Sequence, residues 1–231
     1  MLLDFIFVTN FQIFWRQPNQ MSIEEQNKTL YHEERWNTIT HLLGVIFALV
    51  AFPFLFTDLN NMDNPTIVSL IIYAFSFVFL FSASTIYHFV KDEKKKILWR
   101  KIDHISIYFM ISGTYVPFMI RYIEFDRAII FLSIIYSLVF IGSILKIWFT
   151  GKFEKASLFL YIFLGWMILF IGKSFYQAAD ALVISSVVAG GIAYMAGVYF
   201  YVKDERKYYH AIWHIFVLLG SILHFQGVII A

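Results

Sequence analysis

His210 and His214, four residues apart in the segment YYHAIWHIF, are the pair most suited to chemistry in this chain. On a helix this spacing places both side chains on one face, about 5–6 Å apart at Cβ, which suits two ligands of one metal ion. An H-x-x-x-H pair alone is a weak signal, because it often arises by chance. A third histidine, His88, closes a long apolar segment just before a basic loop. Three imidazoles are a typical ligand set of catalytic zinc and leave a fourth position open.

Two further polar side chains accompany these histidines. Asp103 opens the apolar segment that follows the same basic loop, and Ser84 lies four residues before His88, on the same helical face. A carboxylate near a metal can act as a general base, and a serine can hydrogen-bond the water or an oxyanion. We therefore predict a Zn²⁺ site with Asp103 and Ser84 in catalytic roles. The predicted metal ligands are His88, His210 and His214. The alternative is a set of histidines that merely pack near lipid headgroups.

Other polar residues leave further hypotheses open. Glu34, Asn37 and His41 recur at helical spacing and extend a polar stripe into the first apolar segment. This stripe could surround a metal site or clamp two helices together. His104 points about 100° away from the preceding carboxylate, which favours a hydrogen bond at the lipid interface or between helices. His224 lies about 21 Å from His210 along the same helix, which is too far for the two residues to share one site.

The composition indicates a membrane protein. Of the 231 residues 60% are apolar, 20% aromatic and only 15% charged, whereas soluble domains are nearer half apolar and a quarter charged. This composition excludes a disordered protein, and the absence of cysteine excludes disulfides, thiol chemistry and Cys-ligated metals. The net charge of +2 is too small to indicate a nucleic-acid partner.

Seven apolar segments position these residues. Each approaches the roughly 20 residues that a membrane helix needs, and long runs without period-2 alternation are typical of helices. The fifth is the shortest, because Lys173 and Gln177 interrupt it. We predict an all-α bundle of seven transmembrane helices in the cell membrane. The expected spans are 39–57, 67–90, 103–121, 128–149, 157–173, 179–202 and 210–230.

Loops rich in basic residues alternate along the chain with loops that have few. The loops expected on one side, with the N-terminal segment, hold 15 of the 18 Lys and Arg residues. Basic residues favour the cytoplasmic side, so we expect a cytoplasmic N-terminus, an extracytoplasmic C-terminus and a site near the cytoplasmic face. The other side holds Arg121, Arg127 and Lys173 only.

The N-terminal 20 residues are apolar but too short to span a membrane, and they lack the features of a secretory signal. We interpret them as an interfacial helix or an over-extended start, with Met21 as the alternative to Met1. No repeat or linker divides the rest. We expect a cytoplasmic N-terminal segment, 1–38, and one seven-span domain, 39–231.

Four motifs together resemble the hemolysin III family, which belongs with the progestin and adiponectin receptor family of seven-span proteins. These motifs are EERWNTITHLLG, SASTIYH, RKIDHISIYFMISGTYVPF and HAIWHIFVLLGSILHF, and the similarity covers nearly all of residues 33–228. The resemblance implies seven helices with the N-terminus inside. It also implies zinc on three histidines that match His88, His210 and His214, with a carboxylate matching Asp103 and a serine matching Ser84.

The combined features favour a zinc-dependent hydrolase of a lipid amide or ester in a bacterial plasma membrane. Zinc can acidify a water, and a site at headgroup depth reaches a carbonyl whose acyl chain lies in the bilayer. By analogy only, the family resemblance implies ceramide-like substrates. Two rival functions are a membrane-permeabilising hemolysin, acting by cytolysis, and a membrane sensor or receptor with a structural zinc. Membrane lipids are the expected environment, and no protein partner is indicated.

Overall fold

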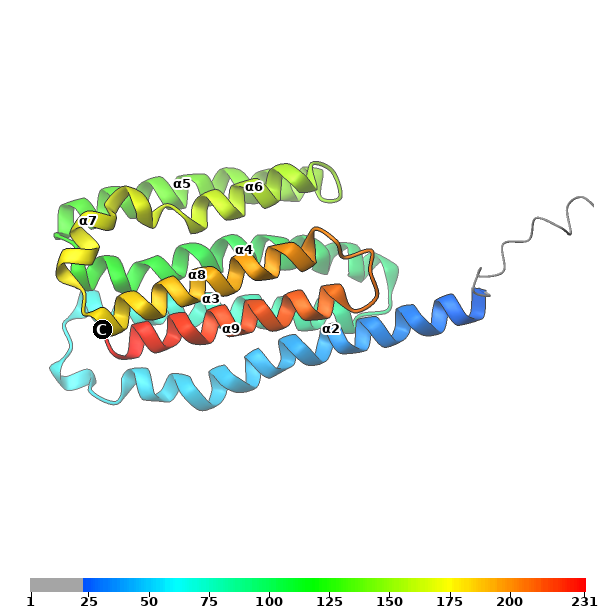
Figure 1. Ribbon diagram of the computed structural model, residues 1–231, viewed down its shortest axis with the longest axis horizontal. Helices are drawn as coiled ribbons and strands as arrows, with labels where there is room; N and C mark the ends of the chain where they lie inside the picture. The colour runs from blue at the N-terminus through cyan, green and yellow to red at the C-terminus, as the bar shows by residue number, and fades with distance from the viewer. Residues whose placement is uncertain (1–22) are drawn as a thin grey trace, which may run out of the picture. The chain divides into compact units, whose positions relative to one another are not determined.

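The computed structural model describes residues 23–231, and this part of the chain is all-helical, without β-strands. The predictions for residues 1–20 lie outside the described residues. The chain divides into compact units of residues 1–32 and 33–231, and the second unit is a helical bundle (Figure 1). The helices are α2 (Ile23–Ala51), η1 (Phe52–Phe56), η2 (Leu59–Asn61), α3 (Asn64–Phe89), α4 (Glu93–Tyr122), α5 (Phe125–Phe149), α6 (Glu154–Gly165), α7 (Ile168–Ala178), α8 (Ala181–Tyr201) and α9 (Tyr209–Ile229).

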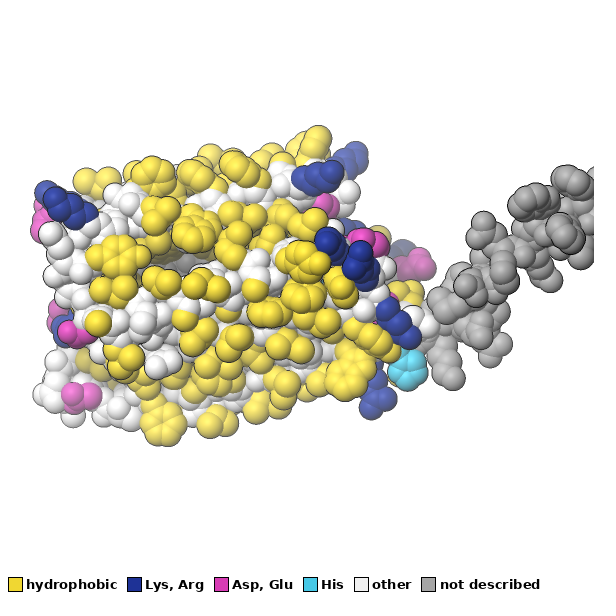
Figure 2. Space-filling model, viewed as in Figure 1, with side chains coloured by type: hydrophobic (Ala, Val, Ile, Leu, Met, Phe, Trp, Pro, Cys, Tyr) yellow, Lys and Arg dark blue, Asp and Glu magenta, His cyan; other side chains and the backbone are white. Residues whose placement is uncertain are grey.

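Six stretches of the described chain are long and apolar enough to cross a membrane. Large apolar side chains such as Leu49 and Phe170 remain exposed along them, as expected for surfaces that contact lipid. Figure 2 shows apolar side chains covering one face of the bundle between its ends, with the basic side chains at the ends. The prediction of a multi-pass membrane protein is confirmed. The six stretches are Thr29–Phe56, Asn64–Phe89, Phe125–Phe149, Glu154–Ala178, Ala181–Tyr201 and Tyr209–Ile229.

The remaining expected span, 103–121, lies in α4, which is less apolar than the other six. This helix occupies the interior of the bundle, where it packs against α3, α5, α6, α7 and α9. Residues 112–119 are all buried. Protein rather than lipid covers α4. Its serines and threonines can be buried there because their hydroxyls bond to the helix backbone, as the Thr114 hydroxyl does to the carbonyl oxygen of Met110. The structure is therefore consistent with the predicted seven-span bundle.

The first candidate span, Thr29–Phe56, overlaps the expected span 39–57 and extends further toward the N-terminus along α2. Two acidic residues in this extension have partners in other parts of the bundle. Glu34 accepts a hydrogen bond from Lys96 Nζ at 2.6 Å, and Glu33 accepts one from the backbone N–H of Tyr208 at 2.8 Å. These contacts bring the α3–α4 and α8–α9 loops to the same end of the bundle, in agreement with the expected alternation of the loops. The side of the membrane stays a prediction.

The fifth expected span is a broken helix, composed of α6 and α7. The break leaves helix-end backbone groups without partners inside an apolar layer, where each unpaired group is costly. Tyr115 on α4 compensates for the break. Its hydroxyl lies 2.9 Å from the carbonyl oxygens of both Leu164 and Gly165, and it accepts a hydrogen bond from the N–H of Ile168 at 3.1 Å. One phenol therefore stabilises both helix ends.

Replacing Tyr115 by Phe should leave the Gly165 carbonyl and the Ile168 N–H without this partner and lower the free energy of unfolding by about 1–3 kcal/mol. The Leu164 carbonyl keeps its hydrogen bond from the Met167 N–H. Thermal unfolding in detergent checks this. Tyr176→Phe on α7 is the control, because its hydroxyl has no hydrogen bond within the described chain and its side chain is 41% exposed. Equal unfolding temperatures for both variants would show that the break does not need the phenol.

Candidate metal centre

The structure places all five predicted site residues at one end of the bundle. Ser84 and His88 lie in the last turns of α3, Asp103 lies on α4, and the remaining two open α9. His210 is half-buried, and the other four side chains are buried. Since α9 begins at residue 209, His210 and His214 occupy its first two turns on one face.

The three predicted ligands face one another. Their ring centroids are 5.0 Å apart for His88 and His214, 5.2 Å for His88 and His210, and 4.6 Å for His210 and His214. One nitrogen of each ring lies within 4.8 Å of the other two, so the group could hold a metal ion. Neither Asp103 nor Ser84 belongs to this group.

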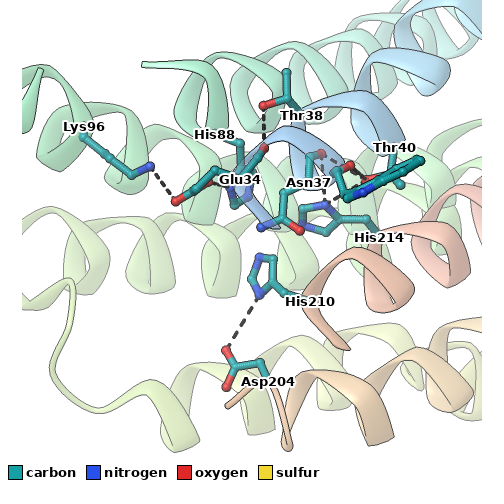
Figure 3. A network of polar contacts seen from close by, with 10 residues as sticks. Glu34, Asn37, Thr38, Thr40, His88, Lys96, Asp204, His210 and His214 are labelled. Carbon is teal, nitrogen blue, oxygen red and sulfur yellow. Dashed lines mark hydrogen bonds and ion pairs between the residues drawn. The ribbon is translucent and has the colours of Figure 1, made fainter. Parts of the chain in front are cut away.

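His88 is oriented by a carboxylate behind its ring (Figure 3). Its Nδ1 lies 2.6 Å from Glu34 Oε2, and the other oxygen of Glu34 accepts a hydrogen bond from Lys96 Nζ at 2.6 Å. A carboxylate only accepts, so Nδ1 carries the proton and Nε2 keeps its lone pair. Within the described chain, His88 Nε2 is buried and has no hydrogen-bond partner. This is the carboxylate–histidine arrangement that orients ligands of zinc.

The other two rings are also contacted through Nδ1. His214 Nδ1 lies 3.3 Å from the carbonyl oxygen of Asn37 and 3.2 Å from the Thr40 hydroxyl. His210 Nδ1 lies 3.7 Å from Asp204 Oδ2, and this neighbouring ring lowers the pKa of the Asp204 carboxyl in the α8–α9 loop. These contacts leave Nε2 of each ring available. The donor set therefore fits a zinc ion held by three neutral imidazoles.

The polar stripe on α2, whose role the sequence left open, surrounds these histidines. Glu34 contacts His88, and the backbone of Asn37 contacts His214. The ring of His41 is buried and lies edge-on against that of His214, with 3.8 Å between centroids. These three residues contact two of the predicted ligands and join α2 to α3 and α9.

Asp103 lies outside the group of three histidines that could hold a metal ion. It is buried, and Ser84 and His210 are near its carboxyl. Asp103 and His210 also line the same cavity, of about 420 Å³. Aromatic side chains from α3, α6 and α9, namely Tyr87, Tyr161 and Trp213, form part of its wall. A ligand in this cavity would contact both the carboxylate and one of the candidate metal ligands.

Two histidines that the sequence analysis excluded from the ligand set, His104 and His224, have other partners, and His104 also lines the cavity beside Asp103. His104 Nδ1 is 3.8 Å from a carboxylate on α6, and His224 Nε2 is 3.2 Å from a backbone carbonyl on α8. Sequence reasoning missed Lys96, Thr40 and Asp204. The polar stripe on α2 was the signal for Thr40, whereas no spacing pattern marks Lys96 or Asp204, which reach the site from loop-proximal positions.

Fold and site together define a polytopic helical membrane protein with a three-histidine centre at one end of its bundle. Residues 29–225 match the family model described as Haemolysin-III related. Hemolysin-3 homolog of Bacillus subtilis (strain 168) is 36% identical over 190 residues, which cover 82% of this chain and 89% of the relative. Hemolysin-3 of Bacillus cereus is 35% identical over 194 residues, 84% of this chain and 89% of that protein. Human monocyte to macrophage differentiation factor is 25% identical over 207 residues, 87% of this chain and 85% of the human protein. This chain belongs to the haemolysin-III related family.

Proposed function

We propose that this protein is a zinc-dependent hydrolase of membrane lipids, with zinc bound by His88, His210 and His214. The observation that carries the proposal is the contact behind each ring. A carboxylate or a carbonyl oxygen lies near Nδ1 of each of these three histidines, which leaves Nε2 of each ring available to a metal ion. Histidines that only packed near headgroups would not need such uniform orientation.

The donor set favours a catalytic rather than a structural zinc. Structural sites supply four protein ligands, whereas catalytic sites supply three and keep one position open. The described residues offer a group of three. With zinc in place, the ion would polarise a carbonyl and lower the pKa of a water molecule toward neutrality.

The chain's own residues would handle the proton and the substrate. Asp103 is positioned to take the proton from the attacking water as the oxygen adds to the carbonyl carbon, and then to give that proton to the leaving alcohol or amine. The Ser84 hydroxyl, which is near Asp103, would donate its hydrogen bond to the carboxylate at first and to the developing oxyanion once Asp103 has taken the proton. Glu34 would hold His88 in the correct tautomer.

A lipid substrate suits the location of this chemistry. The histidines and Asp103 lie at one end of a membrane-spanning bundle, where an acyl chain can remain in the bilayer while its amide or ester reaches the site. The adjacent cavity of about 420 Å³ falls within the range typical of small-ligand sites.

Purified protein tests the proposal against a panel of ester- and amide-linked lipids, with released fatty acid measured by mass spectrometry. Chelation should abolish the release and added zinc should restore it. No release from any lipid, together with dye leakage from liposomes, would instead support membrane permeabilisation, the activity that the name Hemolysin-3 suggests for the Bacillus cereus relative. Neither release nor leakage, with zinc bound, would support a sensor.

Replacing Glu34 by Gln should weaken zinc binding by roughly ten- to a hundred-fold, because the charge that holds the Nδ1 proton of His88 is lost. Competition with a chromogenic chelator measures this affinity. Glu205→Gln, which removes the same charge from an exposed position in the α8–α9 loop, should leave it unchanged. Equal zinc affinity in both variants would contradict an orienting role of Glu34.

A further inference from the structure

The cavity beside Asp103 and His210 has a second group of charged residues, which the proposed reaction does not use. Arg100 on α4 and both Glu154 and Lys155 at the start of α6 line it. These residues lie at the same end of the bundle as the histidines. They are therefore available to contact a part of a ligand that the site does not cleave.

The carboxylate in this group is already neutralised by another cation. Glu154 Oε2 lies 2.7 Å from Nζ of Lys146, whose side chain is only 2% exposed. Glu154 Oε1 accepts a hydrogen bond from the Gly151 N–H at 3.0 Å. A buried lysine needs such a partner, so this pair holds the α5–α6 loop in place. Glu154 consequently has little capacity left to neutralise a further cation.

The two cations that line the cavity form no ion pair closer than 3.5 Å with any residue that the structure describes. Arg100 contacts Glu154 only at 3.5 Å and its side chain is 43% exposed. Within the described chain, Lys155 forms no ion pair, and its side chain is exposed. The remaining carboxylates of the cavity are Asp103 and Asp204, and the charge of Arg100 acts on both. Among the described residues, Lys155 is therefore the cation of the cavity without a carboxylate partner, whereas Arg100 is shared.

We infer that this cavity binds the phosphate of an anionic phospholipid headgroup through Arg100 and Lys155. Arginine and lysine are the side chains that recognise phosphate, arginine through two parallel N–H groups. Lipid phosphate lies at the membrane interface. Arg100 and Lys155 lie near the ends of α4 and α6 and are expected at the same depth. The inference rests on the proposed function for one point, that the ester or amide of the same lipid lies beside the histidines. The substrate of the proposed hydrolase would then be an anionic phospholipid rather than a neutral ceramide-like lipid.

Equilibrium binding to purified protein in a neutral detergent tests the inference without turnover. The probes are an ether-linked lysophosphatidate, which has no ester to cleave, and the alkylglycerol of the same chain length. Wild-type protein should bind the phosphate-bearing probe roughly ten-fold or more tightly than the neutral one. The double variant Arg100→Gln/Lys155→Gln should lose this difference and keep its zinc content, which shows that it is folded.

The matched control is Lys101→Gln/Lys152→Gln, which removes two neighbouring cations that do not line the cavity. This control should keep the preference for the phosphate-bearing probe. Equal binding of both probes to wild-type protein, or an equal loss in both double variants, would overturn the inference. Displacement of the lipid probe by inorganic phosphate at similar concentration would also overturn it, because the ligand would then be free phosphate. Lipid hydrolysis without charge-selective binding would leave the proposed function standing, and charge-selective binding without hydrolysis would leave only the binding site.

Discussion

Purified wild-type protein should contain about one zinc ion per chain, and His214→Ala should contain little. Removal of this side chain leaves two imidazoles from different helices, so zinc affinity should fall by more than the ten- to a hundred-fold loss typical of residues that only orient a ligand. Elemental analysis of protein purified without chelators measures the stoichiometry. His214 is the best residue for this test because it contacts His41 and both other predicted ligands.

His224→Ala is the matched control for this variant. It removes a histidine from the same helix, ten residues further on and about 15 Å away along its axis. His224 packs closely against Gly190, where an added Cβ would lie 2.4 Å from its ring. Its loss should therefore affect helix packing without affecting zinc. Equal zinc contents in the wild type and both variants would rule out the three-histidine site.

Asp103→Asn should retain zinc and lose lipid hydrolysis by roughly a hundred- to ten-thousand-fold, the usual contribution of a general base. The amide preserves the shape of the carboxylate and its contact with Ser84, but it cannot accept the proton of the attacking water. Hydrolysis rates and zinc contents measured on the same preparations separate the two effects.

Asp126→Asn at the opposite end of the bundle provides the control, because it makes the same chemical change at an exposed position. This variant should keep both zinc and activity. Loss of zinc from Asp103→Asn, comparable to that from His214→Ala, would instead make Asp103 a direct metal ligand. The open coordination position would then be filled, and the hydrolytic mechanism would lose its basis.

The spans could be predicted from sequence because apolar length alone decides whether a helix can cross a bilayer. The candidate stretch that contains the first expected span extends back to Thr29. The partners of Glu33 and Glu34 in this extension could not be predicted, because Tyr208 and Lys96 come from distant parts of the chain. The break between α6 and α7 could not be predicted, because its stability depends on Tyr115 from a different helix.

The candidate site was accessible to sequence reasoning where its residues share a helix or a depth. The spacing of His210 and His214 and the position of His88 at a span end were sufficient to group them. The groups that contact Nδ1 of each ring could not be predicted, because they depend on rotamers and on contacts between distant helices. The spacing of the polar stripe singled out Glu34 but did not reveal its contact with His88. Asp204 belongs to no spacing pattern that would have marked it.

The most direct test of the central claim is hydrolysis of the panel of ester- and amide-linked lipids by zinc-loaded protein in water enriched in the heavy oxygen isotope. Hydrolysis places one oxygen atom from water in the released fatty acid. Mass spectrometry should therefore detect heavy fatty acid with wild-type protein and only background with Asp103→Asn. Zinc-loaded, folded wild-type protein that forms no more heavy fatty acid than Asp103→Asn would contradict the assignment of this protein as a lipid hydrolase.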